Sequence, residues 1–153
     1  MTRVGVISDT HGLLRPAALA ALDGSDLIVH AGDIGPEDIL DRLAEIAPVT
    51  AVRGNVDRSP WCSNLGVDAV IELDGRFLYV IHDLGGLDLD PAMAGFDVVI
   101  SGHSHRPGVT EREGVMYLNP GSAGPRRFSL PVSLATLEVA QSGIAVHLHE
   151  FPA

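Results

Sequence analysis

The sequence predicts an α/β fold in which two mixed β-sheets pack together within one domain. Short β-branched runs alternate with helix-forming segments in the first third of the chain. The second half instead carries pairs of strand-like runs joined by turn residues, which is typical of antiparallel hairpins. No Pro-, Gly- or Ser-rich linker divides the two halves, so we expect a single domain over residues 1–153.

Strands and helices alternate at the start of the chain. Apolar, β-branched composition predicts strands at residues 3–7, 26–30 and 49–53. A helix is expected from Pro16 to Leu22, because proline suits the first helical turn and alanine and leucine favour helix. A second helix is expected to begin at residues 36–38, where acidic side chains suit the helix dipole, and to end before Pro48. This βαβαβ order predicts parallel strands joined by crossover helices.

Hairpins are expected in the second half of the chain. The turn Asp74-Gly75 predicts a hairpin of residues 69–73 and 76–81. Further apolar runs predict a buried strand at 97–100 and two more hairpins, of residues 109–112 with 115–118 and of residues 132–139 with 144–149. We therefore expect a fold that begins with parallel strands and finishes largely antiparallel.

The charge balance excludes several classes of partner. All ten basic residues are arginine, and they stand against 20 acidic residues for a formal net charge of −10. Long nucleic acids and anionic membranes are bound through basic faces, so we expect neither as a partner. An acidic substrate remains compatible with this charge, because a bound metal ion can reverse the local field.

Cysteine content and the N-terminal segment favour a cytoplasmic protein. The single cysteine, Cys62, excludes an intramolecular disulfide framework and a cysteine-rich zinc site. The apolar run Val4–Ile7 is too short for a signal sequence, and no stretch approaches the ~20 apolar residues of a membrane span.

Side chains that can bind metal ions follow five of the predicted strands. They are Asp9 and His11, Asp33, Asn55, His82, and His103 with His105. Ligands bind beyond the carboxyl ends of parallel strands, so we expect these groups to share one edge of the sheets. Each motif alone also fits an ordinary turn or a structural histidine, but their conjunction favours a metal site. Seven mixed nitrogen and oxygen donors exceed the needs of one ion, whereas two ions that share a carboxylate would use them all.

This series of motifs resembles the calcineurin-like metallophosphoesterase superfamily, and within it the small single-domain, YfcE-type phosphodiesterase branch. The family pattern of Asp-x-His, Gly-Asp, Gly-Asn-x-Asp, a lone His and Gly-His-x-His is met in order. The matching residues are Asp9/His11, Gly32/Asp33, Gly54/Asn55/Asp57, His82 and Gly102/His103/His105. The segment Asn119-Pro120-Gly121-Ser122 also resembles this branch, so the resemblance covers nearly the whole chain.

The resemblance implies a four-layer α-β-β-α sandwich and a dinuclear metal-dependent phosphodiesterase. It implies a first ion held by Asp9, His11 and His105, a second held by Asn55, His82 and His103, and Asp33 as the bridge. A hydroxide between the ions would attack the phosphorus of a small phosphodiester, with Asp33, Asn55 and His82 as the catalytic residues. Manganese is the favoured metal, and iron, zinc, nickel or cobalt are the alternatives.

Two departures from the family pattern concern the general acid. Many relatives carry a histidine after Gly-Asn, where this chain has Val56. The branch often reads His-Gly-His where this chain has His82 followed by Asp83 and Leu84. A general acid is typically worth 10²–10⁴-fold in rate. We therefore expect diesters and aryl esters with good leaving groups to be better substrates than alkyl monoesters.

Substrate contacts, partners and two rival functions remain open at this point. Arg53, Arg106 and Arg126 are candidates for contacting the substrate phosphate, although each also fits an ordinary surface arginine. The first rival function is a non-catalytic protein-interaction scaffold on the same fold, for which the related retromer subunit is the precedent. The second is a metal-binding regulatory protein without catalysis. The branch often forms homo-oligomers, but no face of this chain identifies an interface.

Overall fold

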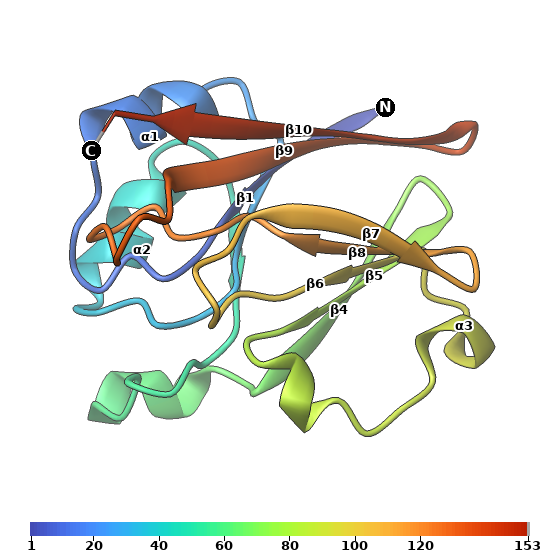
Figure 1. Cartoon of the computed structure of the whole chain (residues 1–153), viewed down its shortest axis with the longest axis horizontal. Helices are drawn as coiled ribbons and strands as arrows, with labels where there is room; N and C mark the ends of the chain where they lie inside the picture. The colour runs from blue at the N-terminus through green and yellow to red at the C-terminus, as the bar shows by residue number, and fades with distance from the viewer. Residues whose placement is uncertain (153) are drawn as a thin grey trace.

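Two five-stranded sheets lie face to face in the computed structural model, which describes residues 1–152 (Figure 1). The first sheet has the order β10 (Gly143–Phe151), β9 (Val132–Ala140), β1 (Thr2–Ile7), β2 (Leu27–His30) and β3 (Val49–Ala51). The second has the order β4 (Asp68–Leu73), β5 (Arg76–Ile81), β6 (Val98–Ile100), β8 (Val115–Asn119) and β7 (Gly108–Arg112). The predicted α/β class with two packed mixed sheets is confirmed.

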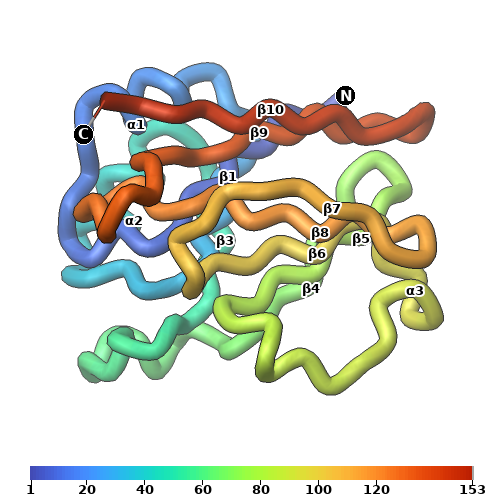
Figure 2. Tube along the Cα trace, viewed as in Figure 1, coloured from blue at the N-terminus to red at the C-terminus, as the bar shows by residue number. Residues whose placement is uncertain are grey.

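Each sheet contains three neighbouring parallel strands. In the first sheet β1, β2 and β3 are parallel, while β9 pairs antiparallel with both β1 and β10. In the second sheet β5, β6 and β8 are parallel, and β4 and β7 pair antiparallel on the two edges. The β9–β10 hairpin runs the length of the molecule along one edge (Figure 2). All three predicted hairpins are present, with Asp74-Gly75 and Glu113-Gly114 in left-handed turn conformations.

The main core fills the space between the two sheets. Alternate residues of the strands point inward, as the two-residue period of a β-strand requires. Val4, Val6 and Val29 of the first sheet belong to the same buried cluster as Leu78 and Ile100 of the second. This core fixes the two sheets against each other, so loops that follow strands of either sheet can contribute to one site.

Helices cover the outer face of the first sheet. Helices α1 (Pro16–Leu22) and α2 (Asp38–Ala44) bury Leu22, Ile39 and Leu43 against Ile7 and Ile28. Proline begins α1 as predicted, whereas α2 is shorter than predicted, because Pro36 and Glu37 lie in the turn before it. Within residues 1–152, no helix has the length and apolar character needed to cross a bilayer.

The fourth layer consists mainly of loop. The segment between β5 and β6 covers the outer face of the second sheet and contains the short 3₁₀ helix η2 (Leu84–Gly86) and the four-residue helix α3 (Pro91–Ala94). A further 3₁₀ helix, η1 (Pro60–Asn64), lies between β3 and β4. These three short helices were not predicted, because segments of three to five residues have no hydrophobic period that a sequence pattern could reveal.

Strand register places the predicted site residues at one end of the molecule. Ile7 pairs with His30, and His30 pairs with Ala51, so β1, β2 and β3 end side by side. In the second sheet Val80 pairs with Ile100, and the Gly102 N–H donates to the His82 carbonyl at 3.0 Å. The loops after all five strands therefore begin at the same end of the two sheets.

Candidate metal centre

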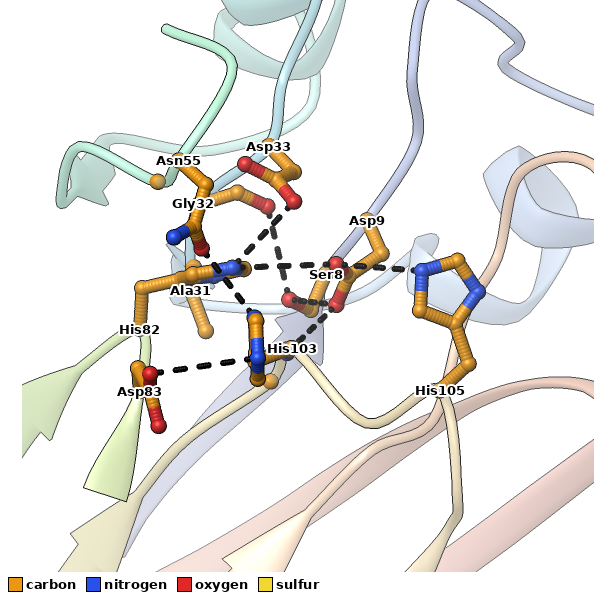
Figure 3. Close-up of polar contacts among 12 residues, drawn as sticks. Ser8, Asp9, Ala31, Gly32, Asp33, Asn55, His82, Asp83, His103 and His105 are labelled. Atoms are coloured by element: carbon orange, nitrogen blue, oxygen red, sulfur yellow. Dashed lines mark hydrogen bonds and ion pairs between the residues drawn. The ribbon is translucent and has the colours of Figure 1, made fainter. Parts of the chain in front are cut away.

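The loops that follow five strands bring seven polar side chains together, as the sequence predicts. Figure 3 labels all of them except His11. One group contains Asp9, His11 and His105, whose ligand atoms all lie within 4.8 Å of one another. His11 Nε2 lies 3.8 Å from Asp9 Oδ1, and His105 Nε2 lies 3.4 Å from the same oxygen. These residues come from β1 and β6, which belong to different sheets, so this part of the site exists only when the sheets are packed.

A second group lies next to the first and shares Asp9 with it. It contains Asp9, Asp33 and His82. His82 Nε2 lies 3.2 Å from Asp33 Oδ2 and 3.9 Å from Asp9 Oδ1. Asp33 Oδ2 also lies 3.8 Å from His11 Nε2, so this carboxylate stands between a histidine of each group.

Asn55 and His103 form the more exposed side of the site. His103 Nδ1 lies 3.1 Å from Asn55 Oδ1, and its ring meets the His82 ring edge-on with the centroids 5.3 Å apart. The His103 Nε2 faces the Asp83 carboxylate at 3.8 Å. His103 is thus in contact with His82 and Asn55, while the His11 and His105 rings form a separate pair with centroids 5.4 Å apart.

Several buried polar atoms at this site have no hydrogen-bond partner. They are Asp9 Oδ1, His11 Nε2, His82 Nε2 and both ring nitrogens of His105. Buried polar atoms are normally satisfied, and leaving one unpaired costs about 1–3 kcal/mol. Orphaned carboxylate and imidazole atoms that converge at 3.4–3.9 Å are the arrangement that divalent cations satisfy. The residues present therefore fit a metal centre.

Each carboxylate uses one oxygen to bind the protein and leaves the other facing the site. Asp9 Oδ2 accepts from the Ser8 hydroxyl at 2.6 Å and the His103 N–H at 3.1 Å. Asp33 Oδ1 accepts from the Val56 N–H at 3.0 Å. The His82 Nδ1–H donates to the Ala31 carbonyl at 2.7 Å, which leaves Nε2 as the atom that faces the site.

Five of the seven side chains are held on left-handed backbone. Asp9, His11, Asp33, His103 and His105 have φ between 45° and 70°. Residues other than glycine rarely adopt this conformation, and each costs about 1–3 kcal/mol unless its surroundings enforce it. Most non-glycine residues with positive φ therefore lie at this site. Of the three others, Asp74 and Glu113 belong to tight hairpin turns.

Glycines beside the site allow two loops to approach each other closely. A Cβ on Gly102 would overlap the Ser8 hydroxyl and lie 2.6 Å from Asp9 Oδ2. A Cβ on Gly32, where φ is +103°, would lie 2.6 Å from His82 Nδ1. The glycines of the Gly-Asp and Gly-His motifs are thus required by close contact with side chains that follow other strands, namely Asp9 and His82.

Asp57 and His30 hold the site loops in place through hydrogen bonds to their backbone. The buried Asp57 carboxylate accepts backbone N–H bonds from Asp33, Ile34 and Gly54 at 2.8–2.9 Å. His30 Nδ1 accepts from the Gly32 N–H at 3.1 Å, so its other nitrogen carries the proton and donates to Thr10 Oγ1 at 3.0 Å. Thr10 in turn donates to the Ile34 carbonyl at 2.7 Å, which ties the loop after β1 to the loop after β2.

The Asn119–Ser122 segment supports the site from the opposite side. The Asn119 amide donates to the Gly102 carbonyl at 2.9 Å and to Ser104 Oγ at 3.1 Å. The Ser122 hydroxyl donates to the Asp9 carbonyl at 2.9 Å. This segment therefore braces both the loop after β1 and the loop after β6.

Burial and neighbouring charges shift the pKa of four site residues. Desolvation raises the pKa of Asp9 despite its bond from Ser8 and the nearby histidines. Burial alone would raise the pKa of Asp33, but the close approach of the His82 ring, the bond from the Val56 N–H and the histidine charges lower it below its usual range. Burial alone would lower the pKa of His82, yet the nearby carboxylates of Asp33 and Asp9 and its bond to the Ala31 carbonyl raise it. Desolvation lowers the pKa of His105, and the charge of Arg127 adds to that effect.

The three predicted arginines lie in different surroundings. Arg53 lines a pocket of about 330 Å³ together with Asn55, His82 and Asp83. Arg106 lines a second pocket of about 220 Å³, beside Ser104. Arg126 instead donates to the Leu130 carbonyl within its own loop. The structure therefore brings Arg53 next to the proposed ligands, whereas the Arg126 guanidinium is engaged elsewhere.

The structure adds contributors that the sequence reasoning did not assign. Ser8 and Asn119 orient Asp9 and the Gly102 loop, and the Arg127 charge reaches His105. Ser8 could have been found from its place directly before Asp-x-His, and Asn119 from the Asn-Pro-Gly-Ser motif. No sequence signal separates Arg127 from the adjacent Arg126.

Comparison with known proteins defines the class to which this fold and site belong. The calcineurin-like phosphoesterase superfamily domain matches residues 2–142. A probable metallophosphoesterase of Methanocaldococcus jannaschii is 37% identical over 132 residues, covering 78% of this chain and 67% of the relative. A probable metallophosphoesterase of Methanothermobacter thermautotrophicus is 35% identical, covering 84% and 81%. The phosphodiesterase YfcE of Escherichia coli is 29% identical, covering 90% and 88%.

Solved structures show the same fold. The E. coli YfcE phosphoesterase superposes with a TM-score of 0.68 at 27% identity, covering 89% of this chain and 88% of the other. A novel archaeal phosphodiesterase gives 0.79 at 20% identity, with 96% and 99% covered. Vps29 of Entamoeba histolytica, in complex with zinc, gives 0.74 at 22% identity, with 98% and 99% covered.

The chain belongs to the calcineurin-like phosphoesterase superfamily. This membership confirms the predicted family and supports a hydrolase of phosphate esters that uses divalent metal ions. The four-layer arrangement seen here is the fold of these relatives.

Proposed function

We propose that this protein is a dinuclear metal-dependent phosphodiesterase that hydrolyses small phosphodiesters. The observation that carries the proposal is the set of buried, unpartnered carboxylate and imidazole atoms that converge from both sheets. Family membership and relatives named as phosphodiesterases support the reaction class.

Two groups of side chains would hold the two ions. We assign Asp9, His11 and His105 to the first ion, Asn55, His82 and His103 to the second, and Asp33 to both. Asp33 Oδ2 supports this assignment, because it lies 3.8 Å from His11 Nε2 and 3.2 Å from His82 Nε2. Asp9 Oδ1 also lies near His82, at 3.9 Å, so the two ions would share a strongly anionic space. Mixed histidine and carboxylate donors favour manganese, with iron, zinc, nickel or cobalt as alternatives.

The surrounding protein prepares these ligands for divalent ions. Such ions lower the pKa of bound water to about 7 and offset charge on phosphoryl oxygens. The chain fixes the ligand atoms in advance through the bonds of His82 to Ala31 and of Asp9 to Ser8. The strained backbone of the ligand loops is part of the same preorganisation.

The pocket beside Asn55 and His82 suggests where one ester arm binds. Its volume of about 330 Å³ is at the lower end of the range for ligand sites. Val67 and Ile81 give it apolar walls, and Arg53 supplies a positive charge for the phosphate. A net charge of −10 disfavours long nucleic acids, so small diesters are the substrates that fit best.

Metal analysis combined with a diesterase assay tests the proposal. We expect purified protein to bind two Mn²⁺ per chain and to hydrolyse bis(p-nitrophenyl) phosphate with these ions present. Binding of fewer than two ions would exclude the dinuclear centre. Two bound ions with no turnover of any diester would instead favour the non-catalytic scaffold or a metal-binding regulatory protein.

A further inference from the structure

A second pocket begins beside the candidate metal centre and is lined by two arginines. Its volume is about 220 Å³, and we call it the arginine pocket after Arg106 and Arg112. Ser104, which lies between the proposed ligands His103 and His105 in the sequence, also lines it. A molecule bound at the metal centre can therefore extend into this pocket.

The arginine pocket is positively charged, although the protein has a net charge of −10. Among the described residues that line it, none is acidic. Thr110 and Arg112 of β7 face the pocket, whereas Glu111 between them points to the opposite side of the strand. Within residues 1–152, the only arginine in an ion pair with a carboxylate is Arg76, which pairs with Asp97. The two charges of the pocket are therefore not neutralised by neighbouring side chains.

The Arg112 guanidinium is held against an aromatic ring. Its central carbon, Cζ, lies 4.9 Å from the centroid of the Tyr117 ring. A cation over the face of an aromatic ring is attracted to it, while the N–H groups of a guanidinium point outward in its own plane. The ring thus restrains Arg112 and leaves its donors available to bind an oxyanion in the bidentate manner of arginine.

The Ser104 hydroxyl can offer a ligand only its proton. Its oxygen already accepts from the Asn119 amide at 3.1 Å and from the backbone N–H of Arg106 at 3.2 Å. A hydroxyl has two acceptor lone pairs and one proton, so the O–H remains as a donor. This donor and the two guanidinium groups, which cannot accept hydrogen bonds, fit an anion with several oxygens.

We propose that the arginine pocket binds a phosphate group at the far end of one ester arm, so that the preferred substrates are phosphodiesters with a second, terminal phosphate. The inference rests on the proposed phosphodiesterase function and names its substrate class. Two guanidinium groups and a hydroxyl provide more donors than the two oxygens of a carboxylate require, and they match the three oxygens of a terminal phosphate.

The two pockets would receive the two arms of such a diester. The pocket beside Asn55 and His82 has apolar walls, which suit an uncharged arm. Asp83 lines that pocket, and the adjacent Leu84 lines the arginine pocket, so the loop after β5 borders both. A diester with one apolar arm and one phosphorylated arm therefore matches both pockets at once.

Titration of the metal-free protein with inorganic phosphate tests the pocket without turnover and without Mn²⁺, which would itself bind phosphate. In amide NMR spectra the resonances of Thr110 and Arg112 should shift saturably. Arg112→Gln should weaken phosphate binding about 10-fold. Arg42→Gln is the matched control, because it removes the same charge from a pocket that also contains Asp23 and Glu45, and it should bind like the wild type. Unshifted β7 resonances in the wild type, or equal affinity of R112Q and wild type, overturn the proposal.

A matched pair of substrates tests the consequence for catalysis. Ethyl p-nitrophenyl phosphate and 2-phosphoethyl p-nitrophenyl phosphate release the same leaving group and differ only in the terminal phosphate. With Mn²⁺ bound, the wild type should hydrolyse the phosphorylated diester with about 10-fold higher kcat/KM, and R112Q should reduce this preference while R42Q retains it.

Two results of this comparison overturn the substrate class. They are equal kcat/KM for both diesters in the wild type and an undiminished preference in R112Q. Failure to hydrolyse either diester contradicts the proposed function instead, and the phosphate titration then still decides whether the arginine pocket binds phosphate.

Discussion

His82 Nε2 lies 3.2 Å from Asp33 Oδ2, although the two residues follow strands of different sheets. The contact joins the end of β5 to the end of β2 across the main core. It also places a carboxylate with a lowered pKa against a histidine with a raised one. The distance between these two side chains therefore depends on how the two sheets pack against each other.

Replacement of Asp33 by asparagine tests its place between the two ions. An amide oxygen can still accept from the Val56 N–H, so the loop should remain folded, but the negative charge is lost. We expect D33N to bind at most one Mn²⁺ and to lose diesterase activity on the order of 10²–10³-fold. Metal content and the rate on bis(p-nitrophenyl) phosphate measure this, with D88N as the control. Two bound ions and wild-type activity in D33N would contradict the bridging role.

The Asp57 carboxylate should contribute strongly to stability. It is buried and accepts three backbone N–H bonds, whereas the amide of asparagine can place only one oxygen there and directs an NH₂ group at the remaining donors. We expect D57N to lower the free energy of unfolding by about 2–4 kcal/mol. Urea unfolding of the metal-free protein measures it. The control is Asp26→Asn, which neutralises an exposed carboxylate that accepts one backbone N–H bond, from Arg3. Equal losses of stability in both variants would contradict the role of the three bonds to Asp57.

The convergence of the proposed ligand residues was predictable because each follows an apolar strand, and register then brings the strand ends together. Ile7, His30 and Ala51 are paired neighbours, so Asp9, Asp33 and Asn55 had to meet. The contact of Asp83 with His103 was not predictable, because it depends on η2, a three-residue helix without a sequence signature.

The backbone conformation of the loops that carry the proposed ligands could not be predicted from the sequence either. Aspartate and histidine at Asp9 and His105 give no indication of a positive φ, which the surrounding contacts enforce. Asp9 lies close to both His82 and His105. This closeness depends on the directions of the side chains, which the order of the strands does not determine.

Leaving-group chemistry should limit the reaction, because Val56 and Leu84 stand where the family pattern described above has histidine. We expect rates to fall steeply as the leaving group changes from p-nitrophenol to an alkyl alcohol. Val56 is exposed beside Asn55, so Val56→His should raise alkyl ester rates about 10-fold. Val70→His, at an exposed valine of β4 that does not line the pocket, is the control. Comparable wild-type rates on aryl and alkyl esters would eliminate this explanation.

His30 should make folding stability depend on pH. Complete burial lowers its pKa to about 3, against 6.5 for an ordinary histidine. Below pH 6.5 the unfolded chain therefore binds a proton that the folded chain does not, and stability falls as pH decreases toward 3.

Replacement of His30 by glutamine isolates this contribution. Glutamine can accept from Gly32 and donate to Thr10 without titrating, so the loss of stability on acidification should be shallower in H30Q by up to about 1.4 kcal/mol per pH unit. Urea unfolding of the metal-free protein at several pH values measures the slope. His147→Gln, on the exposed face of β10, should keep the wild-type slope. Parallel slopes in wild type and H30Q would contradict the prediction.

Arg53 should bind the substrate phosphate, whereas Arg126 should not. Arg53 shares its pocket with Asn55 and His82, while the Arg126 guanidinium donates to the Leu130 carbonyl. A charge-assisted bond to phosphate is worth about 1.5–3 kcal/mol, and solvent exposure places Arg53 at the low end. We expect Arg53→Ala to raise KM for bis(p-nitrophenyl) phosphate about 10-fold with kcat changed less than about 3-fold. Arg126→Ala should leave both constants unchanged. A fall in kcat with unaltered KM in R53A would instead show that Arg53 stabilises the transition state. Equal effects of the two variants would show that the two arginines act only through the overall charge of the surface.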